Sequence, residues 1–347
     1  MRVILRRMIA VPTHCVRVRK GLALAGASAL LFAGCSSGTD SIAEREAPPT
    51  ESSSEPDVNI VATTTIWADI ASRSLCGLEV ASVIPAGADP HTFETSLADR
   101  ATLEQADLVV ANGLALEEGL VDLLATVADG GTPVIEMTEA VAIRDMGDDR
   151  DDEHDEDHGD EHADDEDHAD HDHDHSGSDP HIWLDPINVA STVNLITEAA
   201  IDAGFDTSVR ACAQDFIDEI EALDTEIADD LSAIPSDRRF LVTNHDALGY
   251  FAERYGFEVV GTVIPSLSTL AETNPADLAD LAAIIEELDI PTVFSEVQAS
   301  ARDADALADA IPGLTVVALD TGSLRDTDDD YLSMMRRNVT AIAEALG

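Results

Sequence analysis

Residues 208–234 read SVRACAQDFIDEIEALDTEIADDLSAI and predict one long amphipathic helix. Apolar residues recur in it at steps of three and four, which places them on one helical face: Phe216, Ile220, Leu223 and Ile227. Pro235 ends the pattern. A helix of roughly 25 residues is about 38 Å long at 1.5 Å per residue, so it is long enough to connect two lobes.

Short apolar runs alternate with amphipathic ones on the N-terminal side of this helix, between residues 58 and 206. The runs expected as buried strands are VNIVATTT (58–65), EVASVIP (79–85), DLVVANG (107–113) and TPVIEM (132–137). The stretches expected as helices are IWADIASRSL (66–75), SLADRATLEQA (96–106) and LEEGLVDLLATVA (116–128). This alternation predicts a β/α lobe around a largely parallel sheet.

A second series of the same kind fills residues 236–347. Its expected strands are RFLVTN (239–244), EVVGTVIP (258–265), TVFSEV (292–297) and LTVVALD (314–320). Its expected helices cover residues 247–256, 275–289, 303–311 and 330–346. The chain is therefore predicted to be an α/β protein of two β/α lobes with mainly parallel sheets. A rigid linker helix within residues 207–235 joins them.

The first 57 residues differ in composition from the rest. They hold Lys20, the only lysine of the chain, and no acidic residue occurs before Asp40. The apolar run GLALAGASALLFAGC (21–35) is too short to span a bilayer, so residues 1–35 are interpreted as a secretory signal peptide. Small residues before Cys35 resemble a lipobox, which makes Cys35 the expected lipidation site; an ordinary cleaved signal is the alternative. Residues 36–57, rich in Ser, Glu and Pro, predict a disordered tether.

The formal net charge is −51, which is extreme for 347 residues. Such a charge argues against binding to nucleic acid or to anionic lipid, because both would be repelled. It suits a protein that handles cations, or a surface adapted to salt. Export also allows the two remaining cysteines of the mature chain, Cys76 and Cys212, to form a disulfide, although the sequence alone leaves that pairing open.

An acidic histidine-rich insert occupies residues 148–175 and contains no hydrophobic residue larger than alanine. It cannot bury a core, so it is predicted to be a mobile loop. Seven of the eleven histidines lie in it: His154, His158, His162, His168, His171, His173 and His175. These side chains could capture metal weakly beside a tighter site, or the insert could be a solvated spacer.

His91 and His245 follow expected strands, and Glu296 and Asp320 end two others, where open α/β sheets place their ligands. His181 follows the histidine-rich insert. Imidazole and carboxylate groups suit Zn²⁺ or Mn²⁺, and three imidazoles favour zinc. Each residue alone has a simpler explanation, such as a surface histidine, an Asx turn at Asp320 or a loop brace at Glu296. Their joint position at strand ends favours a metal site in the cleft between the lobes.

The segments ADPHTFE (88–94), DPHIWLDP (179–186) and NHDALGYF (244–251) resemble the solute-binding lipoproteins of zinc and manganese ABC transporters. The resemblance extends from about Val58 to Leu346 and implies that His91, His181, His245 and Asp320 bind the metal. It also implies that Glu296 supports a ligand from behind, although Val297 stands where the family usually has proline. The insert and the histidine at position 245 are features of the zinc branch, so Zn²⁺ is expected rather than Mn²⁺.

The resemblance implies a monomeric, exported receptor on the outer face of the cell membrane or in a periplasm. It would hand metal to a membrane permease, whose cytoplasmic ATPase supplies energy; the chain itself has no G-x-x-x-x-G-K-[ST] loop. Ordering of the loop that carries His181, with small lobe shifts, is expected on metal binding.

Three alternatives remain at this point: a manganese receptor, a surface protein for zinc buffering or adhesion, and a secreted zinc hydrolase. The hydrolase would need an open coordination position and a base such as Glu296 or Glu94, and no H-E-x-x-H helix is present.

Overall fold

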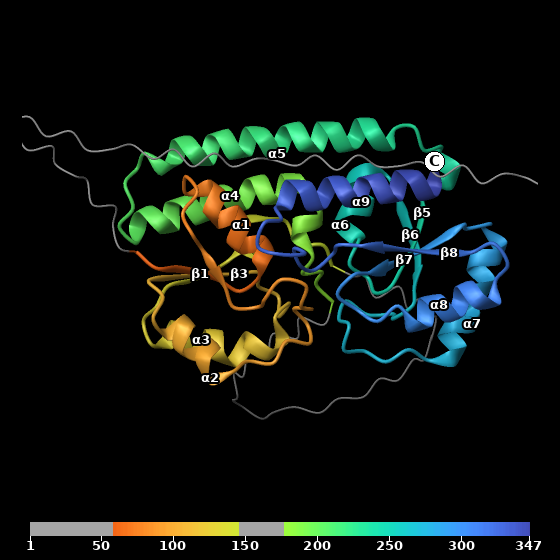
Figure 1. The fold of residues 1–347 in the computed structure, drawn as a ribbon, viewed down its shortest axis with the longest axis horizontal. Coiled ribbons are helices and arrows are strands. Elements are labelled where there is room, and N and C mark those ends of the chain that lie inside the picture. The colour runs from red at the N-terminus through yellow and green to blue at the C-terminus, as the bar shows by residue number, and fades with distance from the viewer. Residues whose placement is uncertain (1–57, 146–176) are drawn as a thin grey trace, which may run out of the picture. The chain divides into compact units, whose positions relative to one another are not determined.

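The computed structural model describes residues 58–145 and 177–347, which form two four-stranded parallel sheets with helices on their faces (Figure 1). The first sheet has the order β2-β1-β3-β4, with β1 at Ile60–Ala62, β2 at Ala81–Ser82, β3 at Leu108–Ala111 and β4 at Val134–Glu136. The second has the order β6-β5-β7-β8, with β5 at Phe240–Thr243, β6 at Glu258–Thr262, β7 at Thr292–Glu296 and β8 at Thr315–Leu319. Within these residues every strand pair is parallel, which confirms the predicted fold class.

Except for α4, which no range given above covers, the helices of the described residues lie where the apolar periodicity placed them. They are α1 (Thr65–Ser74), α2 (Leu97–Glu104), α3 (Val121–Asp129), α4 (Pro186–Asp202), α5 (Val209–Leu231), α6 (Gly249–Tyr255), α7 (Pro275–Glu287), α8 (Arg302–Ala310) and α9 (Tyr331–Leu346). Capping side chains determine where several of these helices begin. Asp185 caps α4 and Asn274 caps α7, each followed by a proline whose fixed φ suits a first helical residue.

Helix α5 extends over both lobes, and α9 runs beside its C-terminal half and contacts β8 of the second sheet (Figure 1). The predicted apolar face of α5 is buried, and the hydrophobic cluster to which it belongs includes Ile60 of the first sheet and Leu319 of the second. Each fully buried side chain of this size contributes about 1.5–3 kcal/mol. The two sheets therefore share one core along α5, whereas α2 and α3 cover the other face of the first sheet and α7 and α8 that of the second.

A disulfide joins Cys76, just after α1, to Cys212 in the first turn of α5, with 5.2 Å between the two Cα atoms. The structure thus contains the pairing that the sequence left open. It links two segments 136 residues apart and fastens the long helix to the first lobe.

No helix in residues 58–145 or 177–347 is both long and apolar enough to cross a membrane. Several sequence predictions concern residues outside these ranges. They are the signal peptide (1–35), lipidation at Cys35, the tether (36–57) and the insert (148–175) with its seven histidines.

Asp69 of α1 faces the N-terminus of α9, where the Tyr331 N–H donates to its Oδ2 at 2.9 Å. Burial raises the pKa of Asp69 to about 6, although this hydrogen bond and nearby Arg73 oppose the shift. The folded chain therefore binds more protons than the unfolded chain between about pH 4 and pH 6, so the free energy of unfolding falls as pH rises through that window.

We expect Asp69→Asn to increase the free energy of unfolding at pH 7.5 by about 2 kcal/mol, because the amide keeps an acceptor oxygen without the buried charge. Urea unfolding from pH 4 to pH 7.5 measures this. The exposed Asp280→Asn on α7 is the matched control. An Asp69→Asn chain with the same pH dependence as the parent would contradict the prediction.

Candidate metal centre

Three histidines from three chain segments meet in the described part of the chain. His91 follows β2, His181 precedes the short 3-10 turn Ile182–Leu184, and His245 follows β5. Each side chain is at most 4% exposed. The Nε2 atom of His181 lies 3.3 Å from Nε2 of His91 and 3.1 Å from Nε2 of His245. Three ring nitrogens therefore converge on one point, in a geometry that would let a single ion contact all of them.

A carboxylate lies behind each imidazole, on the side away from the shared point. Asp179 Oδ1 is 2.9 Å from Nδ1 of His181, and Glu296 Oε1 is hydrogen-bonded to Nδ1 of His245. Glu118 Oε1 lies 3.7 Å from Nδ1 of His91, which has no hydrogen-bond partner. In His181 and His245, a proton held on Nδ1 by such an acceptor leaves the Nε2 lone pair free for a metal.

An Asp-Pro-His turn builds two of the three positions. In each turn the aspartate Oδ1 accepts from the backbone N–H of the histidine, at 3.0 Å for Asp89 and His91 and at 3.0 Å for Asp179 and His181. The proline fixes φ between them. The same short sequence thus gives the same local geometry at two places 90 residues apart.

The segment around His181 is held by buried polar contacts from the first lobe. The Asn112 side-chain amide donates to the Pro180 carbonyl at 2.9 Å, and the Trp67 indole N–H donates to the Asn112 oxygen at 3.0 Å. From the second lobe, the Thr321 carbonyl accepts from the Trp183 indole at 2.7 Å. His181 is therefore positioned by both lobes.

The second sheet places His245 and Glu296 together. They follow the neighbouring strands β5 and β7, at the point where the strand order changes direction, which is where α/β sheets bind ligands. Glu296 lies behind His245, in the supporting position that the sequence suggested. Its other oxygen accepts from the Gln298 amide at 3.0 Å, so the carboxylate is held in place.

Burial and neighbouring charges shift the pKa values of these groups, downward for His181 and upward for His245. Burial, followed by repulsion from His245 and His91, lowers the pKa of His181 well below its usual value. Burial also opposes protonation of His245, but the carboxylate of Glu296 outweighs it and raises the pKa of His245. Burial raises the pKa of Asp179 to about 6. His181 is consequently neutral at physiological pH, which is the form that binds metal.

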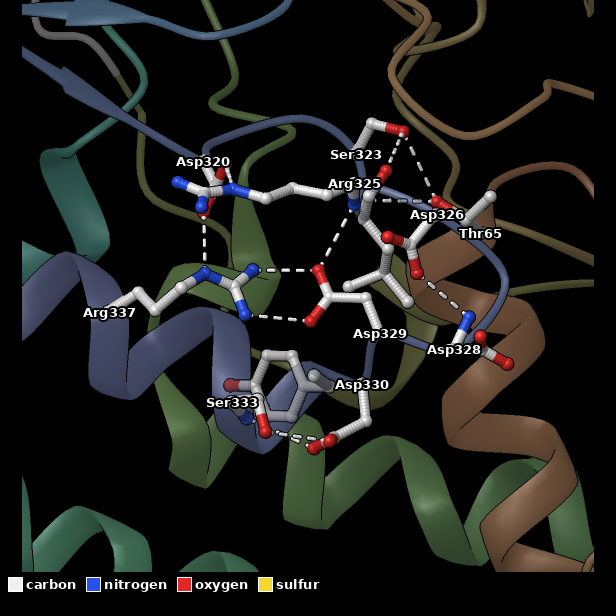
Figure 2. A network of polar contacts seen from close by, with 12 residues as sticks. Thr65, Asp320, Ser323, Arg325, Asp326, Asp328, Asp329, Asp330, Ser333 and Arg337 are labelled. Carbon is white, nitrogen blue, oxygen red and sulfur yellow. Dashed lines mark hydrogen bonds and ion pairs between the residues drawn. The ribbon is translucent and has the colours of Figure 1, made fainter. Parts of the chain in front are cut away.

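Asp320 does not join the three histidines in this structure. It follows β8, its side chain is 1% exposed, and both carboxylate oxygens accept from arginines: Arg325 Nε at 2.8 Å and Arg337 Nε at 3.0 Å (Figure 2). Among the described residues, the group able to hold one ion consists of His91, His181 and His245. The expectation of a fourth ligand from Asp320 is therefore not met by the observed arrangement.

The sequence reasoning missed two carboxylates of the site. Asp179 had a signal, because it stands two residues before His181 as Asp89 does before His91. Glu118 had none, since it reaches His91 from the turn before α3.

The family model described as ZnuA, the periplasmic zinc-uptake complex component A, matches residues 60–345. A manganese-binding lipoprotein, MntA of Halalkalibacterium halodurans, is 27% identical over 77% of this chain and 81% of its own length. The zinc-binding protein TroA of Treponema pallidum is 26% identical over 75% of this chain and 79% of its own. The solved structure of that periplasmic zinc-binding TroA superposes with a TM-score of 0.71 at 25% identity, covering 84% of this chain and 99% of TroA.

Proposed function

Because the chain belongs to the ZnuA family, the metal-binding substrate-binding proteins of ABC transporters, we propose that it is a zinc receptor that binds Zn²⁺ through His91, His181 and His245. Proteins of this family bind and deliver a transport substrate and are not enzymes, and their role requires a membrane permease and an ATPase. The observation that carries the proposal is the convergence of three buried Nε2 atoms. Those of His91 and His245 lie 3.3 Å and 3.1 Å from that of His181.

The donor set favours zinc over manganese. Three imidazole nitrogens suit Zn²⁺, which accepts four-coordinate nitrogen sites, whereas Mn²⁺ prefers carboxylate and water oxygens. The carboxylates of this site lie on the Nδ1 side of the rings, where they offset the charge of a dication without contacting it. Manganese is the second candidate because relatives named for manganese, such as MntA, are as similar to this chain as TroA is.

The three proposed ligands come from both lobes, which suggests how the receptor captures and delivers the ion. His91 and His181 are held mainly by the first lobe and His245 by the second, so a bound ion ties the two lobes together. The shared core along α5 favours small shifts of the lobes over a wide opening. We propose that the permease distinguishes loaded from empty receptor by this small change, and that lipidation at Cys35 keeps the receptor beside the permease.

The test is a competition titration of the chain from residue 36 onward, stripped of metal and lacking Cys35, against a strong zinc chelator. Manganese is offered in separate samples, and a variant without residues 148–175 is measured in parallel. We expect one tight zinc per chain in both forms and weaker binding of manganese. Several weak zinc ions that all disappear with the deletion would place binding in the insert and contradict the proposal.

Glu296→Gln is expected to weaken zinc binding by about 10- to 100-fold, because glutamine keeps the shape but loses the charge that orients and polarises His245. The titration above measures the effect. The exposed Glu258→Gln on β6 is the control for removal of one negative charge. Equal zinc affinity in the Glu296→Gln and Glu258→Gln chains would show that Glu296 has no such role.

A further inference from the structure

Asp320 is a buried carboxylate that directly precedes Thr321 and Gly322 of the histidine cavity, and both of its oxygens accept hydrogen bonds. Arg325 Nε donates to Oδ1 and Arg337 Nε donates to Oδ2 (Figure 2). The Asn338 side chain also binds the backbone of Asp320 in both directions, at 2.8 Å to its N–H and 2.8 Å to its carbonyl. Neither the carboxylate nor the backbone of this residue is free to turn without breaking charged or buried hydrogen bonds.

The two arginines are themselves held in place by Asp329. Both terminal nitrogens of Arg337 donate to Asp329, each at 2.7 Å, and the Arg325 backbone N–H donates to it at 3.0 Å (Figure 2). A planar guanidinium fixed by a two-point contact is pre-organised for a second carboxylate. The Arg337 guanidinium is thus a fixed partner of Asp320. Arg325 is held through its backbone, and its side chain, which is 48% exposed, adds a second contact through Nε.

The next two residues connect Asp320 to the metal centre. Thr321 and Gly322 line the small cavity that contains the three histidines, together with Trp183 and Gln298, whereas Asp320 does not line it. Thr321 is fastened by the Gln298 amide at 2.7 Å and the Trp183 indole at 2.7 Å. A Cβ on Gly322 would lie 2.9 Å from the Gln298 nitrogen, so this wall is close-packed.

We propose that Arg325 and Arg337 determine the metal preference of the site, by binding both oxygens of Asp320 and so keeping this carboxylate off the metal. The inference rests on the proposed zinc site and specifies how that site selects its ion. With Asp320 withheld, the protein offers three imidazole nitrogens and no direct carboxylate, a shell that suits Zn²⁺ better than Mn²⁺. Loss of the arginines would leave a buried carboxylate without a partner beside a cation site, and an oxygen ligand for manganese would become available.

The experiment compares zinc and manganese affinities of the chain from residue 36 onward with those of its Arg325→Gln/Arg337→Gln variant. We expect manganese affinity to rise at least about tenfold while zinc affinity changes by less than about threefold, because the freed oxygen ligand is the kind that manganese prefers. Adding Asp320→Asn to the double variant should restore the parent preference. Arg336→Gln, on the same helix but paired with exposed Glu226, is the control and should change neither affinity.

Two results would overturn the inference. One is an unchanged ratio of zinc to manganese affinity in the folded double variant. The other is a loss of about tenfold or more in zinc affinity for Asp320→Asn alone, which would show that Asp320 contacts zinc although both arginines are present. If the double variant does not fold, Arg325→Gln alone must shift the ratio in the same direction. Failure of the parent chain to bind zinc tightly would instead refute the proposed function.

Discussion

Replacing His181 with alanine is expected to lower zinc affinity by about a thousandfold or more, beyond the 10- to 100-fold that loss of a supporting group costs. His181 is the shared member of the cluster, since its Nε2 lies within 3.3 Å of Nε2 in both other rings. Its lowered pKa also means that no proton must leave before metal binds. Alanine would leave two imidazoles and a buried gap between them.

The measurement is the chelator competition titration, with thermal unfolding of the metal-free chains as the check on folding. His168→Ala in the insert is the matched control, because it removes the same side chain without touching the described site. We expect the control to bind zinc as the parent does. A His181→Ala chain that folds and retains parent-like zinc affinity would exclude the three-histidine centre.

Removal of the disulfide by Cys76→Ser/Cys212→Ser is expected to lower the free energy of unfolding by about 3 kcal/mol. The bond closes a loop between residues 136 apart, so its loss gives the unfolded chain more conformational freedom. It also releases the start of α5 from the end of α1, and α5 lies on the core that both sheets share.

Urea unfolding with and without a reductant measures this effect. The reductant should bring the parent chain to the stability of the double variant and leave the variant unchanged. Equal stability of oxidised and reduced parent would show that the bond does not support the fold. A single Cys76→Ser chain is less informative, because it leaves Cys212 free to react.

Periodicity was enough to predict the architecture. Each of the eight apolar runs contains a strand, and the four residues that the spacing named are all on the buried face of α5. The lengths of the strands were less predictable. A run of seven residues was expected as the strand at β2, and only two of them pair with β1. A strand ends where its neighbour stops offering hydrogen-bond partners, and that depends on tertiary contacts rather than on local composition.

The site was predictable in part. The histidines were found from their places after strands and from the resemblance, and the structure brings all three together. Asp320 shows the limit of such reasoning. Its position after β8 was correct, but the direction of its side chain depends on Arg325 in the next loop and Arg337 on α9, which no strand or helix pattern reveals. The partners of a long arginine side chain depend on which groups the tertiary fold brings within its reach.

The carboxylates around the centre lie behind its imidazoles or are matched by arginines. Glu118, Asp179 and Glu296 each lie behind one imidazole, and Asp320 is matched by two guanidinium groups. A dication bound at the proposed site would therefore contact imidazole nitrogens and be balanced by carboxylates one ring further out. The arrangement attracts a cation without supplying the oxygen ligands that manganese prefers.

X-ray absorption at the zinc edge tests the central claim most directly, on the loaded chain without residues 148–175 and with one zinc per chain. We expect three imidazole nitrogens at about 2.0–2.1 Å from the zinc and no sulfur. His91→Ala, His181→Ala and His245→Ala should each remove that signal. A zinc shell made mainly of oxygen atoms, or one that keeps three imidazoles after any of these substitutions, would contradict the account.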